Sequence, residues 1–494
     1  MKMSRAREIT AKFFLKLRRI LHHCVHVSIG VLLVSSYIVL VLLCFIKLIF
    51  HQRLILARKK TNQAPTYGFL HPFASDGGGG ERVLWHTICT ALNSTKNKQF
   101  GQHVLYHTNP AVSIESLEEN VQRHFGICCN LLKHKRRNNF RVVYADANNL
   151  LPGRYQSLTL YRQAIASVLF VMSCLQEHTP TIFIDTFGVP FAYPLCHLMG
   201  VKVLCYVHYP FISSLHLKAL ESSKTSLYAL VRNGYLEYMH ILYQCTGSFI
   251  DKCAVNSSWT LHHMQIIWKT KHSIQLIFPP VSDVRSSIPA SSRLHTIVSV
   301  SQFRREKNHP LQLSVFSKLL ADTNATFVII GSVRNRTDRD YLEELQNLAI
   351  RLGISDNIKW LINVSNEQRR LILRNSLIGI HTMQDEHFGI SIVEYMAAGC
   401  ISIAHASGGP QTDIIHPAFQ TTTPMYDAKA TCQHAVGFLA TNEASYLQAI
   451  HTILSMSESE RTKIRHHANL SIQKFSSDTF TNSIHTLIKD ISTS

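Results

Sequence analysis

Short apolar runs recur along the chain from residue 67 onward, and stretches with a helical spacing of apolar residues separate them. Within 81–93, for example, Leu84, Ile88 and Leu92 recur at the spacing of one helix face. Short apolar runs bounded by polar residues predict buried strands. Strands that alternate with helices predict a parallel sheet with helices on both faces. These runs lie at 67–70, 103–106, 141–145, 181–185, 202–206 and 274–278.

The same alternation of predicted strands and helices begins again after a polar stretch. Residues 282–293 read SDVRSSIPASSR, a Ser-rich composition that predicts a linker. The chain therefore predicts an α/β fold with two Rossmann-like, doubly wound domains, at 61–281 and 294–470, followed by a helical tail at 471–494. Such sheets bind ligands at the carboxyl ends of their strands, so the two domains would face each other across a cleft. The second set of strands is predicted at 295–300, 326–331, 358–362, 378–381 and 401–404.

A strongly apolar segment precedes the first predicted domain. Residues 27–46 carry no charge over twenty positions, which is long enough to span a bilayer as a transmembrane helix. They lie within an N-terminal anchor region at 1–60. A buried core helix is the alternative, whereas the run is too long for a signal peptide. Arg18 and Arg19 precede the span and basic residues at 58–60 follow it, so the flanking charge defines no orientation.

Composition and charge narrow the class of protein. Hydrophobic residues make up 46% of the chain and charged residues 16%, which is typical of a globular protein with membrane contact. The net charge is +19, but residues 1–60 carry twelve lysines and arginines against one acidic residue. Because the excess lies beside the anchor and no nucleic-acid-reading module is recognised, we expect no nucleic-acid partner. The twelve cysteines include no C-x-x-C pair, so we expect reduced thiols and no zinc site.

Four consecutive glycines, Gly77, Gly78, Gly79 and Gly80, lie between the first predicted strand and the helix at 81–93. A helix N-terminus presents free N–H groups and a partial positive charge, and glycines let a phosphate or a sugar approach the backbone. No G-K-[ST] sequence follows, so the segment is not a Walker A loop. A flexible turn is the alternative.

A basic loop opens the second predicted domain. The segment SQFRREKNHP, Ser301–Pro310, follows its first strand and places Arg304 three residues before Lys307. A guanidinium and an ammonium group at this spacing suit a diphosphate. A solvated charged loop is the alternative.

Two glutamates eight residues apart flank the start of another predicted helix. The segment DEHFGISIVEYMAAGC, Asp385–Cys400, predicts a helix from about 391 to 398 that ends at Gly399. Glu386 would precede this helix and Glu394 would lie in its first turns, so both carboxylates could face one ligand. A surface pair is the alternative.

Two further segments follow predicted strands and would lie at the cleft. His208, in CYVHYP, comes directly after the strand at 202–206, although a single histidine is more often structural. The loop SGGPQTDII, residues 407–415, is rich in small residues and could approach a donor phosphate or sugar.

In combination, these motifs resemble the retaining glycosyltransferases of family four, which have the GT-B fold. Within that family the chain is most similar to the endoplasmic-reticulum α-1,2-mannosyltransferases that use GDP-mannose and dolichol-linked oligosaccharides. The resemblance covers roughly residues 66–440, with the motifs in the family's order. The motifs that carry it are HPFASDGGGGERVLW, FIDTFG, CYVHYP, VNSSWT, QFRREKNHP, HTMQDEHFGISIVEYMAAGC and AHASGGPQTDI.

The resemblance implies a role for each candidate residue. Lys307 and Arg304 would bind the donor diphosphate with help from the glycines at 77–80, although Gln302 stands where the broader family places its arginine. Glu394 would hold the ribose, and Glu386 would contact the mannose or its developing positive charge. His208 would lie near the reacting carbon of the donor sugar. The remaining donor-binding positions are Phe388, Gly389 and Ile390, and no metal or other cofactor is expected.

The resemblance also implies partners and a location. The substrates would be GDP-mannose and a dolichyl-diphosphate-linked trimannosyl oligosaccharide. The chain would be a single-pass protein of the endoplasmic reticulum membrane, in contact with membrane lipid, with its catalytic domains facing the cytosol, and could act with other mannosyltransferases of the pathway. A UDP-sugar donor and a non-catalytic subunit with the same fold remain alternatives.

Overall fold

The computed structural model describes most of the chain. The linker predicted at 282–293 and the basic residues at Arg18, Arg19 and 58–60 lie outside the described residues. The described residues are 28, 30–49, 66–94, 102–212, 227–269, 273–281, 294–416, 419–420 and 434–493.

The N-terminal lobe is built on a parallel, seven-stranded sheet with the order β3-β2-β1-β4-β5-β6-β7. The order reverses beside β1, as in a doubly wound fold. Six of these strands were predicted, whereas β6 was missed. The strands are β1 (Tyr67–Leu70), β2 (His103–His107), β3 (Phe140–Tyr144), β4 (Ile182–Asp185), β5 (Lys202–Val207), β6 (Lys252–Val255) and β7 (Ile274–Leu276).

Helices cover both faces of this sheet. One buried apolar cluster includes side chains of α5, α6 and α8, and a second includes side chains of α2 and α3. The helices of the lobe are α2 (Gly79–Ser94), α3 (Ile114–Phe125), α4 (Leu131–Arg136), α5 (Thr159–Glu177), α6 (Tyr193–Leu198), α8 (Leu227–Thr246) and α9 (Ser258–Trp268).

The C-terminal lobe repeats the architecture with a second parallel sheet, in the order β10-β9-β8-β11-β12-β14-β13. The strands are β8 (Leu294–Val300), β9 (Thr326–Gly331), β10 (Ile358–Ile362), β11 (Ser376–Ile380), β12 (Ile401–His405), β13 (Phe419–Gln420) and β14 (Phe438–Ala440). The helices are α10 (His309–Leu319), α11 (Arg336–Arg351), α12 (Asn366–Asn375), α13 (Ile390–Ala398), α15 (Glu443–Ser455), α16 (Glu458–Ser471) and α17 (Ser477–Thr493).

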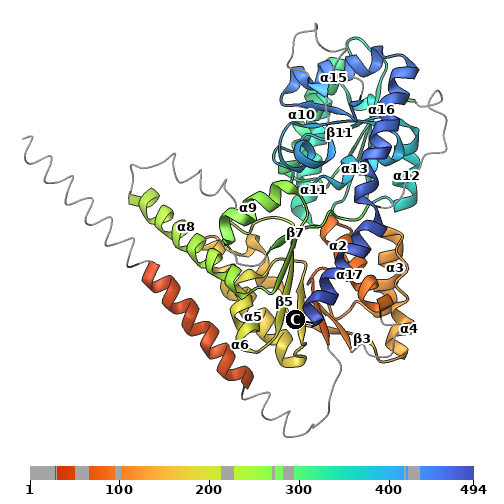
Figure 1. Cartoon of the computed structure of the whole chain (residues 1–494). Helices are drawn as coiled ribbons and strands as arrows, with labels where there is room; N and C mark the ends of the chain where they lie inside the picture. The colour runs from red at the N-terminus through yellow and green to blue at the C-terminus, as the bar shows by residue number, and fades with distance from the viewer. Residues whose placement is uncertain are drawn as a thin grey trace, which may run out of the picture.

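Helix α17 returns from the C-terminal lobe to the N-terminal lobe (Figure 1). Its apolar face, which includes Phe480, Ile484 and Leu487, is buried in the same cluster as side chains of α2. The last helix of the chain therefore joins the two lobes and supports the helix that follows the four glycines.

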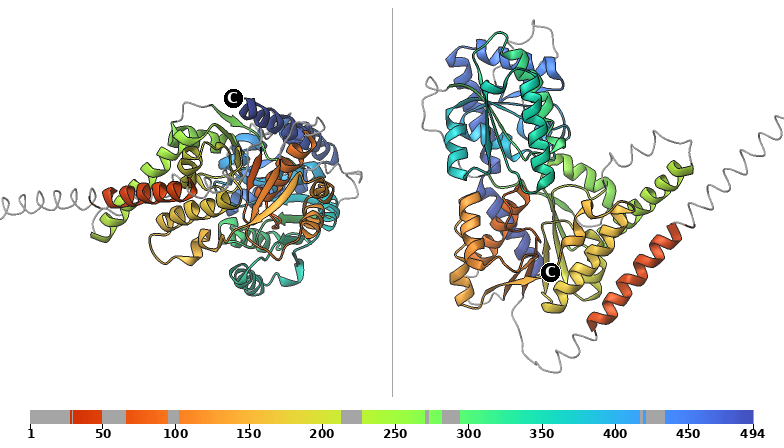
Figure 2. Two further views of the ribbon diagram at one scale, coloured as in Figure 1. Left: turned by 90° about the horizontal axis from the view of Figure 1, so that it is seen from below. Right: turned by 180° about the vertical axis from the view of Figure 1, so that it is seen from behind.

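The described residues include one helix, Gly30–Ile49, that is long and apolar enough to cross a membrane, with a mean hydropathy of 2.6. It lies beside α8 in Figure 1 and in the right-hand view of Figure 2, and Gly30 lies against the Tyr238 ring of α8. One face, which includes Tyr37 and Val41, is buried against the N-terminal lobe, and the Tyr37 hydroxyl donates a 2.6 Å hydrogen bond to the Phe191 carbonyl. Apolar residues such as Leu32 and Leu43 are exposed on the other face.

The expectation of uniformly reduced thiols was wrong for one pair. A disulfide joins Cys89 of α2 to Cys129, whose Cα atoms lie 5.2 Å apart. The two cysteines are 40 residues apart in sequence, so no local spacing could reveal the pair. The disulfide ties α2 to the segment between α3 and α4.

Candidate active site

The glycine loop lies at the carboxyl edge of the first sheet and touches the second lobe. Helix α2 begins inside the glycine run, at Gly79, two residues earlier than predicted. A Cβ atom on Gly79 would lie 2.8 Å from Cδ1 of Ile390, the first residue of α13. Two donor-binding positions predicted on different lobes therefore meet, and a larger residue at position 79 would displace the end of the Ile390 side chain.

His208 lies against the same loop. A Cβ atom on Gly80 would lie 3.6 Å from His208 Nε2. Burial, reinforced by the nearby His71, lowers the pKa of His208 to about 4, so its imidazole is neutral near pH 7. Its Nε2 is buried and has no hydrogen-bond partner among the described residues. A neutral imidazole at this position can donate to or accept from a polar ligand group.

Beneath the loop lies a pair that the sequence analysis missed. His71, directly after β1, has its Nε2 3.4 Å from Glu81 Oε1 and its Nδ1 3.0 Å from the Thr186 hydroxyl. Burial alone would raise the pKa of Glu81, but its hydrogen bond and ion pair with His71 lower it. Since β1, β4 and β5 are adjacent and parallel, residues that follow them meet at one edge. The adjacency of these parallel strands was the signal that could have placed His71 at the site.

Lys307 and Glu386, predicted from separate motifs, form a direct ion pair. Lys307 Nζ lies 2.5 Å from Glu386 Oε2, and His381 Nε2 lies 3.1 Å from the same oxygen. Burial would raise the pKa of Glu386, but Lys307 and His381 outweigh it and hold the pKa well below its usual range. Glu386 is therefore an ionised, buried carboxylate at the carboxyl edge of the second sheet. His381, directly after β11, was not predicted.

Arg304 lies apart from this pair. Its Nη1 is 3.7 Å from Glu306 Oε1, and its side chain is about one third exposed. The Lys307 N–H donates a 3.1 Å hydrogen bond to the Arg304 carbonyl, but no contact of the Arg304 side chain among the described residues reaches Lys307 or Glu386. The role of Arg304 at the diphosphate stays a prediction.

Glu394 joins the two lobes. Its Oε1 lies 2.7 Å from Arg82 Nη2, contributed by α2, and 3.3 Å from Arg369 Nη2, contributed by α12. Burial would raise the pKa of Glu394, but the two guanidinium groups lower it. The second glutamate of the motif is thus an ionised carboxylate held by one arginine from each lobe.

The backbone around Glu386 is shaped by its neighbours Phe388 and Gly389 and by the loop at 407–415. Gly389 has φ +105°, which favours glycine, and it directly precedes α13. Phe388 is buried in the core of the C-terminal lobe. The Gly409 N–H donates a 2.8 Å hydrogen bond to the Glu386 carbonyl, so the small-residue loop packs on the catalytic candidate.

Comparisons with known proteins identify the family. Residues 64–268 match the family described as ALG11 mannosyltransferase N-terminus, and residues 283–461 match Glycosyl transferases group 1. The chain is 34% identical over 447 residues to the mouse GDP-Man:Man(3)GlcNAc(2)-PP-Dol alpha-1,2-mannosyltransferase, covering 85% of this chain and 86% of the relative. The chain belongs to this mannosyltransferase family. The human relative of that name is 34% identical over 483 residues, covering 90% of this chain and 93% of the relative.

Solved structures confirm the predicted GT-B fold of this mannosyltransferase family member. A glycosyltransferase from Rickettsia africae superposes with a TM-score of 0.56 at 16% identity, covering 87% of this chain and 99% of the other. HepE from Anabaena, solved with UDP and glucose, superposes with a TM-score of 0.57 at 13% identity, covering 86% of this chain and 100% of the other. At these identities the likeness concerns the fold alone.

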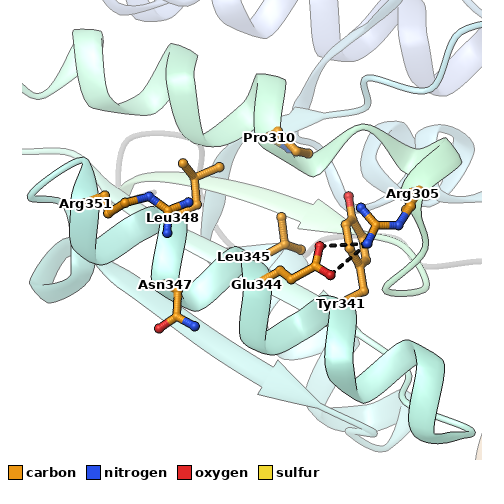
Figure 3. Close-up of a pocket in the computed structure, with 8 residues that line it drawn as sticks. All are labelled: Arg305, Pro310, Tyr341, Glu344, Leu345, Asn347, Leu348 and Arg351. Carbon is orange, nitrogen blue, oxygen red and sulfur yellow. Dashed lines mark hydrogen bonds and ion pairs between the residues drawn. The ribbon is translucent and has the colours of Figure 1, made fainter.

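A surface cavity lies outside the site of this mannosyltransferase family member (Figure 3). It has a volume of about 290 Å³ and lies between α11 and the start of α10. Arg305, at its rim, donates two hydrogen bonds to Glu344, at 2.7 and 2.8 Å. None of the predicted site residues lines this cavity.

Acidification is expected to destabilise the protein through its buried histidines, three of which lie in or beside the candidate site. Burial lowers the pKa of His208 and of His387 to about 4, and that of His309 to about 3. Because these values lie below the unfolded-state value of about 6.5, the unfolded chain takes up protons first, and stability falls as the pH drops below about 6.5. Each histidine should cost about 1 kcal/mol at pH 5.5. Thermal unfolding at pH 7.5 and 5.5 measures the effect, and His208→Gln should reduce the difference. A thermal midpoint that is the same at both pH values would contradict this prediction.

Proposed function

We propose that the protein transfers mannose from GDP-mannose to a dolichyl-diphosphate-linked trimannosyl oligosaccharide, with retention, forming α-1,2 linkages. The observation that carries the proposal is the buried site at the junction of the lobes, with the Lys307–Glu386 pair and Glu394 in a chain of this family. The relatives' name supplies the donor and the acceptor.

The proposed reaction is a front-face displacement. The bond between the mannose anomeric carbon and the diphosphate oxygen breaks, and GDP leaves with the electron pair. The acceptor hydroxyl oxygen bonds to the same face of that carbon, and its proton passes to the departing diphosphate. The protein must therefore align both substrates and stabilise charge on the diphosphate and on the sugar.

The described residues offer groups that suit these demands, and the proposed reaction involves no metal ion. Lys307 would exchange part of its contact with Glu386 for the diphosphate, and Arg304 and the backbone at Gly77–Gly80 would add further donors. Glu386, ionised and buried, would then face the positive charge that develops on the mannose. His208, whose pKa is about 4, would offer a neutral hydrogen-bonding group to the sugar.

We also propose that the protein acts at the endoplasmic reticulum membrane with its lobes facing the cytosol. The apolar helix Gly30–Ile49 supports contact with membrane lipid, because one face packs on the N-terminal lobe and the other exposes apolar residues. A lobe docked on its own anchor would meet an acceptor that is confined to the bilayer. Association with other mannosyltransferases belongs to the same proposal.

The test is sugar transfer onto a synthetic lipid-linked trimannosyl acceptor by the full chain in membranes. GDP-mannose is compared with UDP-glucose and UDP-N-acetylglucosamine, and Glu386→Ala serves as the inactive control. Transfer from GDP-mannose alone, with product sensitive to an α-1,2-mannosidase, is the expected result. Transfer from a UDP-sugar alone would overturn the donor assignment, and no transfer from any donor would favour a non-catalytic subunit.

A further inference from the structure

Arg82 belongs to one lobe, but its guanidinium group contacts the other. It lies in the first turn of α2, shortly after the four glycines. Its Nη2 donates to Glu394 Oε1 on α13, across 312 positions of sequence. The side chains are almost completely buried, at 5% exposed for Arg82 and 6% for Glu394. This contact brings a positive charge of the N-terminal lobe to the carboxylate proposed to bind the ribose.

The remaining N–H donors of Arg82 have no partners in the described part of the chain, so its ion pair with Glu394 is badly suited to a purely stabilising role. Its Nε and Nη1 are buried without a hydrogen-bond partner among the described residues. The guanidinium carbon lies 5.8 Å from the centre of the Phe125 ring, a weaker contact than a hydrogen bond. Burying a charge is costly, and unpaired donors add to that cost. Stability alone therefore does not explain an arginine at this position.

The geometry around Glu394 indicates what Arg82 does. The shortest contacts of Arg82 and Arg369 with this carboxylate are both to Oε1, and no hydrogen bond among the described residues reaches Oε2. Arg369 lies in the same lobe as Glu394, so it can hold the carboxylate in any arrangement of the lobes. Arg82 can do so only when the lobes are together. With both arginines on Oε1, the carboxylate is fixed and Oε2 remains able to accept from a hydroxyl group.

We propose that Arg82 is a positioning residue that acts through Glu394 on the ribose of the nucleotide donor. Closing the lobes brings Arg82 to Oε1, which orients Oε2 toward the ribose hydroxyls. Recognition of the nucleotide is thereby coupled to closure of the cleft. This inference rests on the proposed function for the identity of the donor, but it concerns only the ribose that GDP and UDP share.

The experiment compares GDP with 2′,3′-dideoxy-GDP, by calorimetry on the full chain in detergent. The wild type should bind the dideoxy compound more weakly, because Glu394 loses its ribose partners. Arg82→Met should weaken GDP binding by about ten-fold, as expected when a charged hydrogen-bonding group is lost. It should also reduce the difference between the two nucleotides to near unity. The substitution removes the ion pair with Glu394 together with two buried donors that have no partner among the described residues, and it leaves Arg369 on Glu394, so the thermal midpoint should change little.

Two further variants make the result decisive. Arg305→Met removes an arginine that is 72% exposed and paired with Glu344, so it should change neither affinity nor the ribose difference. Arg82→Lys keeps the charge and should restore part of the ribose difference, and it replaces the methionine variant if that one does not fold.

Three outcomes would overturn the inference or separate it from the proposed function. An unchanged ribose difference in Arg82→Met would overturn it, as would an equal loss of affinity for both nucleotides accompanied by a lower thermal midpoint. If the wild type binds UDP instead of GDP, the donor assignment fails, and the same comparison with UDP and 2′,3′-dideoxy-UDP still tests Arg82.

Discussion

Glu386→Ala is expected to leave a folded protein that transfers mannose at least about 100-fold more slowly than the wild type. The carboxylate is ionised because Lys307 and His381 hold its pKa well below the usual range. Its negative charge is thus fixed beside the proposed position of the donor sugar, where positive charge develops as the bond to the diphosphate breaks. Initial rates with GDP-mannose and the lipid-linked acceptor measure the loss.

Two matched variants separate chemistry from folding. Glu386→Gln keeps the shape and the hydrogen-bonding oxygen but removes the charge, so it should be nearly as slow as the alanine variant. Glu344→Ala removes an exposed carboxylate that pairs with Arg305, and it should retain full activity. Substantial turnover by either Glu386 variant, with a thermal midpoint like that of the wild type, would remove Glu386 from the reaction.

The two glutamates of the motif have different surroundings, and the difference follows from the fold. The partners of Glu386, Lys307 and His381, all lie in the C-terminal lobe. Glu394 is shared between the lobes through Arg82 and Arg369. We infer that residues of one lobe hold Glu386, whose charge faces the sugar, in its ionised form. Glu394, the carboxylate assigned to the ribose, gains its full set of contacts only when both lobes are together.

The sequence predicted the fold well because parallel sheets are buried on both faces. Their strands form nearly continuous apolar runs, as in 202–206 and 326–331, which stand out from the helices around them. The missed strands lack that signal. β6 is four residues long and begins with Lys252, and β13 and β14 have two and three residues. Runs of this length are recognised only once their neighbours in the sheet are known.

The site was predicted where a local motif carried its chemistry and missed where distant residues supplied it. Lys307 and Glu386 each lie in a short motif, and the structure pairs them. Arg82 and Arg369 lie on amphipathic helices, where a charge is usually solvent-exposed. Only the packing of α2 and α12 against α13 makes them partners of Glu394, and single-sequence patterns do not encode that packing.

Lys307→Ala is expected to weaken binding of GDP and of GDP-mannose by about 100-fold. The ammonium group is the one predicted diphosphate ligand that the structure places beside Glu386, at 2.5 Å from its carboxylate. A charge-assisted contact to a diphosphate in a largely buried site is among the stronger polar interactions. Calorimetry with GDP, and the KM for GDP-mannose, measure the loss.

The same variant should also change the pH dependence of transfer. Lys307 is the strongest of the groups that lower the pKa of Glu386, so its removal raises that pKa while burial continues to oppose the charge. The fraction of ionised Glu386 at a given acidic pH then falls, and the acid limb of the rate profile should move to higher pH. Lys318→Ala, which removes an exposed lysine paired with Glu443, should shift neither affinity nor profile. Unchanged GDP affinity in Lys307→Ala would place the diphosphate elsewhere, whereas lost affinity with an unmoved acid limb would mean that Glu386 does not set the rate.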